Sequence, residues 1–505
     1  MIKATLLDRA IGVFSPQKAL NRVKARTHLN FLTNSGAYSG ASKKKTSLKG
    51  WKTTKGNSDN TDLPDLELLR DRSFDLYRNN PLANGAVDTA DINIVGTGLK
   101  LQSQVDAEVL NISSEEAEVL SSHIEREFSL WADSKECDTT RTSNFYELQS
   151  IAFLSTLIGG DVVALLPHIK RHNSPYTLSL QLIEAYQISN KDNKPDSEKV
   201  AGGIEVNEYG EPIKYHISKY HPYGLHKGKN SWIVVDTFSK SGNRQLIHLF
   251  DKKRPDQRRG VPFLAPVIES LKQLGRYTEA ELTAAVISGL FTVFIKTELG
   301  EVGDGISSED IDDIDYGLGN GSIVGLAPGE SVESANPGRP NQNFDPFTLS
   351  IIRQIGSSLQ IPYELLIKHF TASYSASRGA LLEAFKFFRK KRKWLATNFC
   401  QLVYEEWLEF AILTGRIEAP GFFDDFSLRK AYCKTSWNGD APGQLDPVKE
   451  TKAAKMRCEE GFSTRTKESA EMNGTDFNSN MNKAKSENSK MIEAGLRKEE
   501  SKDGM

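Results

Sequence analysis

Apolar residues recur at helical spacing through the first third of the chain. The earliest periodic segment ends at Asn79-Asn80-Pro81, and the next ends at the glycine-rich stop Gly96-Thr97-Gly98. Asparagine followed by proline breaks a helix, and glycine commonly follows a helix C-terminus. The spacing therefore predicts helices over residues 63–79, 82–95, 115–131 and 145–158.

The pattern changes between residues 161 and 260. Short runs rich in strand-forming residues alternate there with turn clusters such as Asn190–Asp196 and Gly224–Asn230. The runs span residues 162–166, 178–183, 213–217, 231–235 and 246–249. We expect a β-rich module in this part of the chain.

Two amphipathic helices are predicted to frame an acidic excursion. The first covers 263–290 and the second 344–359, where Ile361-Pro362 stops it. Between them lie the strand-like FTVFIK, the stretch ELGEVGDGISSEDIDDID with eight acids and no base, and short strands near 323–326 and 331–334. A polar loop, HFTASYSASRG, then leads into a long helix from about Ser377 to Leu413, and the last 65 residues are helical in propensity.

Composition shows that much of this chain lies outside an ordinary core. Its 505 residues are only 38% hydrophobic, and 64 basic against 66 acidic residues give a net charge of −2. Balanced charge excludes a chain whose whole surface coats nucleic acid. The first 60 residues hold twelve bases and two acids. Between Ser35 and Asn60 they are also rich in Gly, Ser and Lys and poor in aliphatic residues, so we expect a flexible arm. That arm either remains solvated or becomes ordered against a neighbouring subunit or nucleic acid.

No catalytic or metal-binding constellation stands out. The four cysteines are far apart, His168 and His172 flank a turn-prone stretch, and Gly317–Ser322 lacks the end of a phosphate-binding loop. Pro195–Lys199 has a nuclease-like spacing but lies in a polar loop, which favours a solvated charge run. We therefore predict neither enzyme activity nor a metal or cofactor.

Nothing in the sequence predicts secretion or a membrane span. The longest uncharged run, Leu282–Ile295, is shorter than the about 20 apolar residues that a spanning helix needs. Asp8 and Arg9 would interrupt the apolar region of a signal peptide. The expectation is a soluble protein made inside the cell.

The basic run Lys386–Lys393 leaves two interpretations open. Its cations alternate with aromatic residues, which suits contact with a phosphate backbone. The same pattern fits a solvated helix face with core aromatics behind it.

Several segments together resemble the lambda-type portal proteins of tailed bacteriophages, from about residue 8 to about residue 477. They include AIGVFSPQKALNRVKAR, LRDRSFDLYRNNPLANGAVDTADINIVGTGLKLQ, FSLWADSKECDTTRTSNFYELQSIAFLSTLIGGDVV, HLFDKKRPDQRRGVPFLAPVIESLKQLGRYTEAELTAA, IPYELL with SYSASRGALLEAFKFFRKKR, and WNGDAPGQLDPVKETKAAKMRCEEGFSTRTKESAEMNGTD. No single segment is diagnostic, but six occur in the family's order. One departure is Gln360, where a glycine is more usual in the family.

The resemblance implies a mainly helical α+β fold, assembled as a ring of usually twelve subunits at a capsid vertex. Double-stranded DNA would pass through the ring without sequence-specific contacts during packaging and ejection. The implied partners are the terminase large subunit, which hydrolyses ATP, then a head-tail adaptor, and the major capsid and scaffold proteins. The implied location is the virion, after assembly in the host cytoplasm.

The family architecture of wing, stem, clip and crown follows the pattern along this chain. It implies an arm over 1–60, a wing over 61–262, stem helices over 263–290 and 344–362, and a clip over 291–343. The tunnel loop, the long helix and the rest of the wing would occupy 363–437, and the crown and tail 438–505.

The resemblance also assigns two groups of candidate site residues. The tunnel loop would bring Lys368, His369, Ser373, Tyr374, Ser375 and Arg378 to DNA. The clip would present Glu309, Asp310, Asp312 and Asp313 to terminase or adaptor. Alternatively, Tyr374 and Arg378 only tie the loop to the wing. The competing functions are another head-tail structural or adaptor protein and, less favoured, a DNA-processing enzyme.

Overall fold

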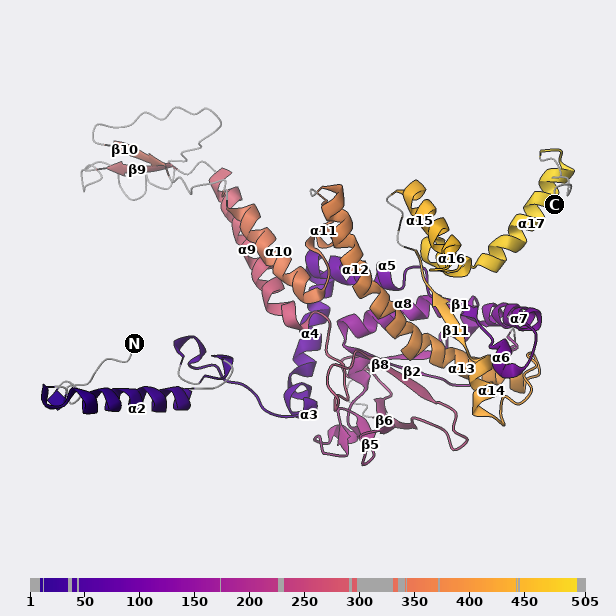
Figure 1. Ribbon diagram of the computed structural model, residues 1–505, viewed down its shortest axis with the longest axis horizontal. Coiled ribbons are helices and arrows are strands. Elements are labelled where there is room, and N and C mark those ends of the chain that lie inside the picture. Colours follow the sequence, from indigo (N-terminus) through magenta and orange to yellow (C-terminus); the bar gives the residue numbers. More distant parts are fainter. Residues whose placement is uncertain are drawn as a thin grey trace, which may run out of the picture. The chain divides into compact units, whose positions relative to one another are not determined.

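The structure is a computed structural model of a mainly helical α+β protein (Figure 1). It divides into two units, Met1–Gly56 and Asn57–Met505, which are described separately here. The described residues are 10–11, 13–34, 39–42, 45–172, 174–225, 231–289, 293–297, 330–334, 341, 343–370, 373–441, 443 and 446–496.

The N-terminal unit is partly helical. Helix α2 spans Pro16–Asn34, and two short 3-10 turns follow at Ser39–Ala41 and Thr46–Leu48. The helix has a local cause, since Pro16–Asn34 contains no glycine and its only proline occupies the first helical position, where a proline is tolerated. It precedes residues 35–60, on whose composition the expectation of a flexible arm rests, and that expectation stays a prediction.

The helices predicted for the first third of the larger unit are confirmed. They are α4 (Leu63–Asn79), α5 (Pro81–Ile94), α7 (Ser114–Ala132) and α8 (Phe145–Ile158). Side chains before each of the last three satisfy backbone N–H groups that a helix start leaves unpaired. Asn80 caps α5, while Ser113 with Glu116 and Asn144 with Glu147 form capping boxes.

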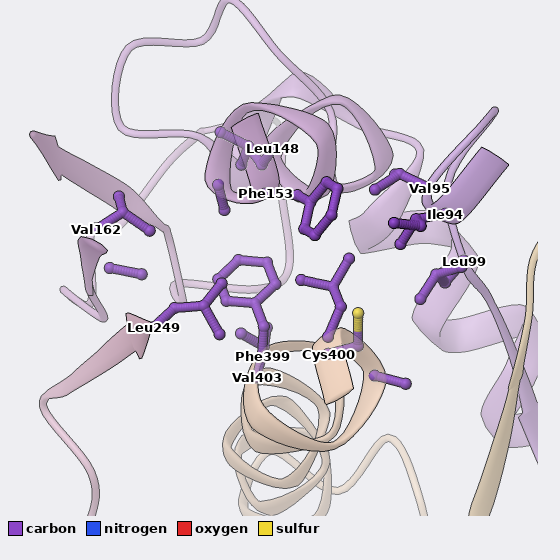
Figure 2. Close-up of a cluster of buried hydrophobic side chains, with 14 of the residues drawn as sticks. Ile94, Val95, Leu99, Leu148, Phe153, Val162, Leu249, Phe399, Cys400 and Val403 are labelled. Atoms are coloured by element: carbon purple, nitrogen blue, oxygen red, sulfur yellow. The ribbon is translucent and has the colours of Figure 1, made fainter. Parts of the chain in front are cut away.

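One large apolar core joins these helices to segments from the end of the chain. Figure 2 shows Phe153 of α8 facing Phe399 and Val403, while Val162 and Leu249 close the cluster from two strands. Phe399 and Val403 belong to the π-helical turn Ala396–Cys400 and to α13 (Gln401–Leu413), which follow α12 (Tyr374–Leu395). The predicted helix from Ser377 to Leu413 is therefore interrupted by this π-turn.

The predicted β-rich module forms two antiparallel sheets. The first has the order β3-β2-β8, with strands Gln181–Glu184, Asp161–Leu165 and Leu246–Phe250. The second has the order β4-β5-β6-β7, with strands Val200–Ala201, Ile204–Val206, Pro212–Ser218 and Trp232–Asp236. Val163 lies opposite both Ile183 and His248 in the first sheet. A smaller core that includes Val163 and Ile204 lies in this module.

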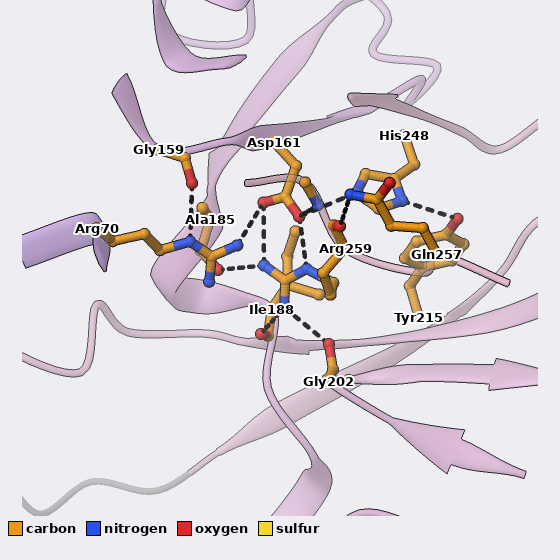
Figure 3. A network of polar contacts seen from close by, with 12 residues as sticks. Arg70, Gly159, Asp161, Ala185, Ile188, Gly202, Tyr215, His248, Gln257 and Arg259 are labelled. Atoms are coloured by element: carbon orange, nitrogen blue, oxygen red, sulfur yellow. Dashed lines mark hydrogen bonds and ion pairs between the residues drawn. The ribbon is translucent and has the colours of Figure 1, made fainter. Parts of the chain in front are cut away.

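A buried polar cluster lies where β2 begins (Figure 3). Asp161 is fully buried and receives hydrogen bonds from Arg70 of α4, from Arg259 and from the Gly260 backbone. Burial alone would raise the pKa of Asp161, but Arg259 and Arg70 outweigh it and hold that pKa well below its usual value. Arg259 also donates to three backbone carbonyls, those of Ala185, Ile188 and Gly202.

Glycines at two positions make this cluster possible. Gly160 has φ +90, and a Cβ there would lie 2.5 Å from the carbonyl oxygen of Gly260. A Cβ on Gly260 would in turn collide with the Gly160 carbonyl. The two backbones therefore approach each other as only glycines allow, and Arg259 is brought over Asp161.

The helix that leaves this cluster starts later than its sequence pattern predicts. Helix α9 spans Ile268–Gly289, after a 3-10 turn at Ala265–Val267 that contains Pro266. Helix α10 spans Phe344–Leu359, as predicted, and packs beside α9. Tyr277 of α9 stacks on Phe344 with ring centroids 5.6 Å apart and meets Phe347 edge-on at 5.2 Å.

A two-stranded hairpin follows α9. Strands β9 (Val293–Thr297) and β10 (Glu330–Ser334) pair antiparallel, with Ile295 opposite Val332. These are the strand-like FTVFIK and the predicted strand near 331–334. The predicted strand near 323–326 lies outside the described residues.

The C-terminal segment is helical, as its propensity predicts. A short sheet of β1 (Lys100–Ser103) and β11 (Thr435–Asn438) precedes α15 (Pro447–Glu459), α16 (Arg465–Asn473) and α17 (Phe477–Glu493). Asp440 anchors the start of this segment, since its carboxylate accepts hydrogen bonds from the backbone and hydroxyl of Thr97. Along the described part of the chain, no helix is both long enough and apolar enough to cross a membrane.

Candidate nucleic-acid interface

The candidate tunnel loop begins at a tight helix end. Gln360 closes α10 in the left-handed conformation at φ 58, and its N–H reaches back to the Gly356 and Ser357 carbonyls. The chain then returns close to α10, where a Cβ on Gly356 would lie 2.6 Å from the Ile361 oxygen. Gln360 thus occupies a backbone conformation that favours glycine. This conformation explains why the family more usually has a glycine at this position.

Lys368 and His369 follow the short helix α11 (Tyr363–Leu366). Lys368 adopts φ 52, and the His369 N–H donates to the Glu364 carbonyl over 3.0 Å. Both side chains are exposed. The turn thus presents the Lys368 ammonium group and the His369 ring to solvent, where both can donate hydrogen bonds to phosphate.

The rest of the candidate loop is more regular than predicted. Helix α12 already begins at Tyr374, so Tyr374, Ser375 and Arg378 are helical and not part of a loop. Ser373 explains the early start, because its hydroxyl accepts a hydrogen bond from the Ala376 N–H and caps the helix. Ser375 is exposed and Arg378 is half-buried, while the side chain of Tyr374 lies outside the described part.

Arg378 faces the segment that precedes α15. Asp446 caps α15 there, and its pKa is lowered mainly by hydrogen bonds from Lys449 and further by the charge of Arg378. This placement is compatible with both interpretations of Arg378, as a phosphate contact or as a tie within the chain.

The basic run of α12 divides into two functional groups. Arg392 donates to the carbonyls of Ile94 and Asn93, and Lys391 pairs with Asp251 over 2.8 Å. Phe387 and Phe388 are buried in the core. These residues hold α12 against the body, whereas Arg389, Lys390 and Lys393 are exposed.

The candidate clip residues Glu309, Asp310, Asp312 and Asp313 lie outside the described residues. The β9–β10 hairpin brings together the two ends of the segment that contains them. Their assignment to a docking surface stays a prediction.

The described residues contain no group of three or more histidine, cysteine or acidic side chains that could hold a metal ion. His168 instead lies 3.0 Å from the Thr177 hydroxyl. Cys137, Cys400 and Cys433 are buried, and burial raises the pKa of the Cys137 and Cys433 thiols to about 12. Thiols of this kind are unreactive.

The sequence did not predict the buried cluster around Asp161. Its only signals are an isolated acid between Gly160 and an apolar strand, and the pair Arg258-Arg259 ahead of a glycine. Neither signal shows that Arg70, ninety-one positions before Asp161, completes the cluster.

Comparison with known proteins gives consistent relatives. The family model described as phage portal protein, lambda family, matches residues 44–392. Portal protein B of Escherichia phage lambda is 25% identical over 455 residues, covering 85% of each chain. The portal protein of Escherichia phage N15 is 24% identical over 460 residues with the same coverage.

Solved structures include a distant likeness. A chain in the neck of an empty GTA particle, computed with C6 symmetry, aligns with 80% of this chain and 92% of its own length at a TM-score of 0.44 and 13% identity. The family model covers well over half of this chain. It spans α4 to most of α12, and so includes α9, α10 and the basic run up to Arg392. The chain therefore belongs to the lambda family of phage portal proteins.

Proposed function

We propose that this portal protein assembles as a closed ring, with about twelve copies, whose central channel passes double-stranded DNA during packaging and ejection. The observation that carries the proposal is the α9–α10 pair. Helix α9 begins nine residues after Arg259 of the buried Asp161 cluster and packs on α10 through Tyr277. The paired strands β9 and β10 lie between the two helices along the chain. This is the arrangement expected of a stem that ends in a clip.

The surface of α9 supports a ring. Its apolar stripe is buried at Leu271 and Leu274 but continues to Leu282 and Val286, whose side chains are 66% and 59% exposed. A second copy packed there would remove these side chains from water, which is favourable. A ring needs two different complementary faces on each subunit, so the exposed half of the stripe would meet another face of the neighbour.

The tunnel-loop residues form the proposed DNA contact. Lys368 and His369 are exposed, and so is Ser373, which caps the start of α12. Ser375 and Arg378 on the first turns of α12, with Tyr374, complete the set. Contacts of this kind position a duplex through phosphate and carry no sequence information, so DNA can slide.

We further propose that the clip acids Glu309, Asp310, Asp312 and Asp313 dock the terminase large subunit and later a head-tail adaptor. Many like charges close together remain in water because burial without partners is costly. The protein would act in the virion beside capsid and scaffold proteins, after assembly in the host cytoplasm. Its role would be structural, with ATP hydrolysis left to terminase.

The ring is tested by light scattering and negative-stain imaging of the purified protein. We expect particles many times the 56.2 kDa chain mass with a central hole. Stable monomers across salt and protein concentration would refute the ring.

The tunnel loop is tested with the double variant K368Q/R378Q in a DNA packaging assay. Rings of normal size that package or retain DNA differently from wild type, and equally so for any DNA sequence, would support the channel contact. The matched control K452Q/K467Q removes two exposed lysines from α15 and α16. Packaging equal to that of the control would refute a channel role for Lys368 and Arg378.

A further inference from the structure

The exposed cations of α12 share one face of the helix. Lys386, Arg389, Lys390 and Lys393 are all exposed and follow one another at intervals of three, one and three residues. Residues three, four and seven apart lie on the same side of a helix. Their backbone positions span about 10 Å at 1.5 Å per residue. We call these four residues the α12 basic face.

Grooves flank this face on both sides. A groove of about 700 Å³ between α12 and the α10–α11 turn includes Lys386, Lys390 and Arg353. A second of about 900 Å³ between α12 and helices α15 and α16 includes Lys386, Arg389 and Arg457. Near the α12 end, a third of about 610 Å³ includes Arg389, Lys393 and Lys430. The face is therefore a ridge that a large partner can reach.

Most cations of the α12 basic face are not neutralised by an ion pair within the described part of the chain. Within the described part of the chain, Arg389, Lys390 and Lys393 have no ion-pair partner, whereas Lys391 and Arg392 in the same run are engaged. Lys386 pairs only with Glu383, and both of those side chains are more than 70% exposed. Such a pair contributes little and is readily exchanged for another anion. No acid occurs along the chain between Glu383 and Glu405, so the four cations follow one another without an acid between them. Acids of other elements line the flanking grooves, among them Glu364, Glu450 and Glu471.

The partner that fits this face is a polyanion with regularly spaced charges, which binds through those charges and does not stack on aromatic side chains. Phe387 and Phe388, the aromatic residues between the cations, are buried and cannot reach a base. Phe385 and Trp394, at the two ends of the run, are half-buried. The exposed groups of this face are therefore mainly its four cations, which favours contact with a phosphate backbone over stacking on unpaired bases. Cations repeated along one helix face over about 10 Å suit successive phosphates of one strand.

We propose that the α12 basic face is a second, sequence-independent contact site for double-stranded DNA, separate from the tunnel loop. The site rests on the proposed function, in which DNA passes through and is retained by this protein. Lys386, Arg389, Lys390 and Lys393 bind backbone phosphates, while Lys391 and Arg392 hold the helix that presents them.

The test measures binding of purified assembled protein to a random-sequence duplex as a function of salt. The variant K386Q/R389Q/K390Q/K393Q removes the face, and K452Q/K467Q/K485Q/K490Q removes four exposed lysines from α15, α16 and α17. Each lost phosphate contact lowers the slope of log K against log salt by roughly one unit. We expect a loss of about two to four units for the face variant, at equal size for AT-rich and GC-rich duplexes.

Several results would overturn the site. Equal slopes in the face variant and the control exclude DNA as the partner. A face variant that stays folded but no longer assembles into particles would also overturn the site, because the face would then be a contact with an acidic surface of another copy of the chain. Thermal unfolding and light scattering of each variant test whether the fold and the ring are intact. A failure of the ring itself is therefore seen separately from a failure of the DNA contact.

Discussion

The guanidinium of Arg259 lies against the carboxylate of Asp161, with Nε 2.6 Å from Oδ2 and Nη2 3.0 Å from Oδ1. Both side chains are buried, and Arg70 approaches the same carboxylate from α4. Arg259 lies nine residues before α9 begins at Ile268. The pair therefore joins the first helices, the β-rich module and the base of the proposed stem.

Removing the charge of Asp161 is expected to destabilise the larger unit. Asp161→Asn leaves Arg70 and Arg259 buried without a counter-charge, and breaking a buried pair typically costs about 3–5 kcal/mol. Urea unfolding followed by circular dichroism measures this cost. The control Glu383→Gln breaks the exposed pair with Lys386 and should change stability by less than about 1 kcal/mol. Equal effects of the two variants would contradict a central role for Asp161.

Asp161 and Glu125 should make the free energy of unfolding depend on pH in opposite directions. The pKa of Asp161 is held well below 3.8 in the folded state, so its contribution is present above the unfolded pKa and is lost as pH falls through the folded pKa. Burial raises the pKa of Glu125 from 4.5 to about 7, against the Ser103 N–H that lowers it. The free energy of unfolding should therefore fall as pH rises from about 4.5 to 7.

Glu125→Gln isolates the second effect. Glutamine still accepts the Ser103 hydrogen bond but does not ionise. We expect a higher unfolding temperature than wild type at pH 8 and no advantage at pH 4. A variant that is equally or less stable than wild type at pH 8 would show that ionised Glu125 is not strained.

Gln360→Gly should stabilise the end of α10. A non-glycine residue in the left-handed conformation costs about 1–2 kcal/mol, and the flexibility of glycine in the unfolded chain returns part of that gain. The net expectation is about 0.5–1 kcal/mol of added stability by urea unfolding. Gln273→Gly, at an exposed position in the second turn of α9, is the matched control and should cost about 1 kcal/mol. Destabilisation by both variants would contradict strain at Gln360.

Charge on the exposed stripe of α9 should block assembly without unfolding the chain. Leu282→Glu and Val286→Glu place carboxylates on the proposed contact between copies, where burial without a partner is costly. Light scattering should then show monomers or small species with wild-type circular dichroism. Val119→Glu, at a 69% exposed position of α7, should leave assembly unchanged. Normal rings from the α9 variants would place the contact elsewhere.

The sequence by itself determined the elements whose causes are local. Proline after Asn80, the Ser113 and Asn144 caps, and the apolar spacing of α10 are each readable within a few residues, and the helices there agree with the prediction. The six family-like segments and their order were also sufficient to predict the family to which the chain belongs. The match of the family model over residues 44–392 confirms that prediction. The assignments to tunnel loop and clip stay predictions.

Only the tertiary structure decided which cations of the basic run Lys386–Lys393 hold α12 against the body and which are exposed to solvent. Lys391 and Arg392 are sequence neighbours of Lys390 and Lys393, but only the first two meet Asp251 and the Asn93–Ile94 carbonyls. Likewise, Asp161 becomes a buried junction only because Arg70 and Arg259 reach it from distant parts of the chain. The physical reason is the same in both cases: helical period assigns a residue to a face, but the partner of a charge is set by long-range packing that no local pattern records.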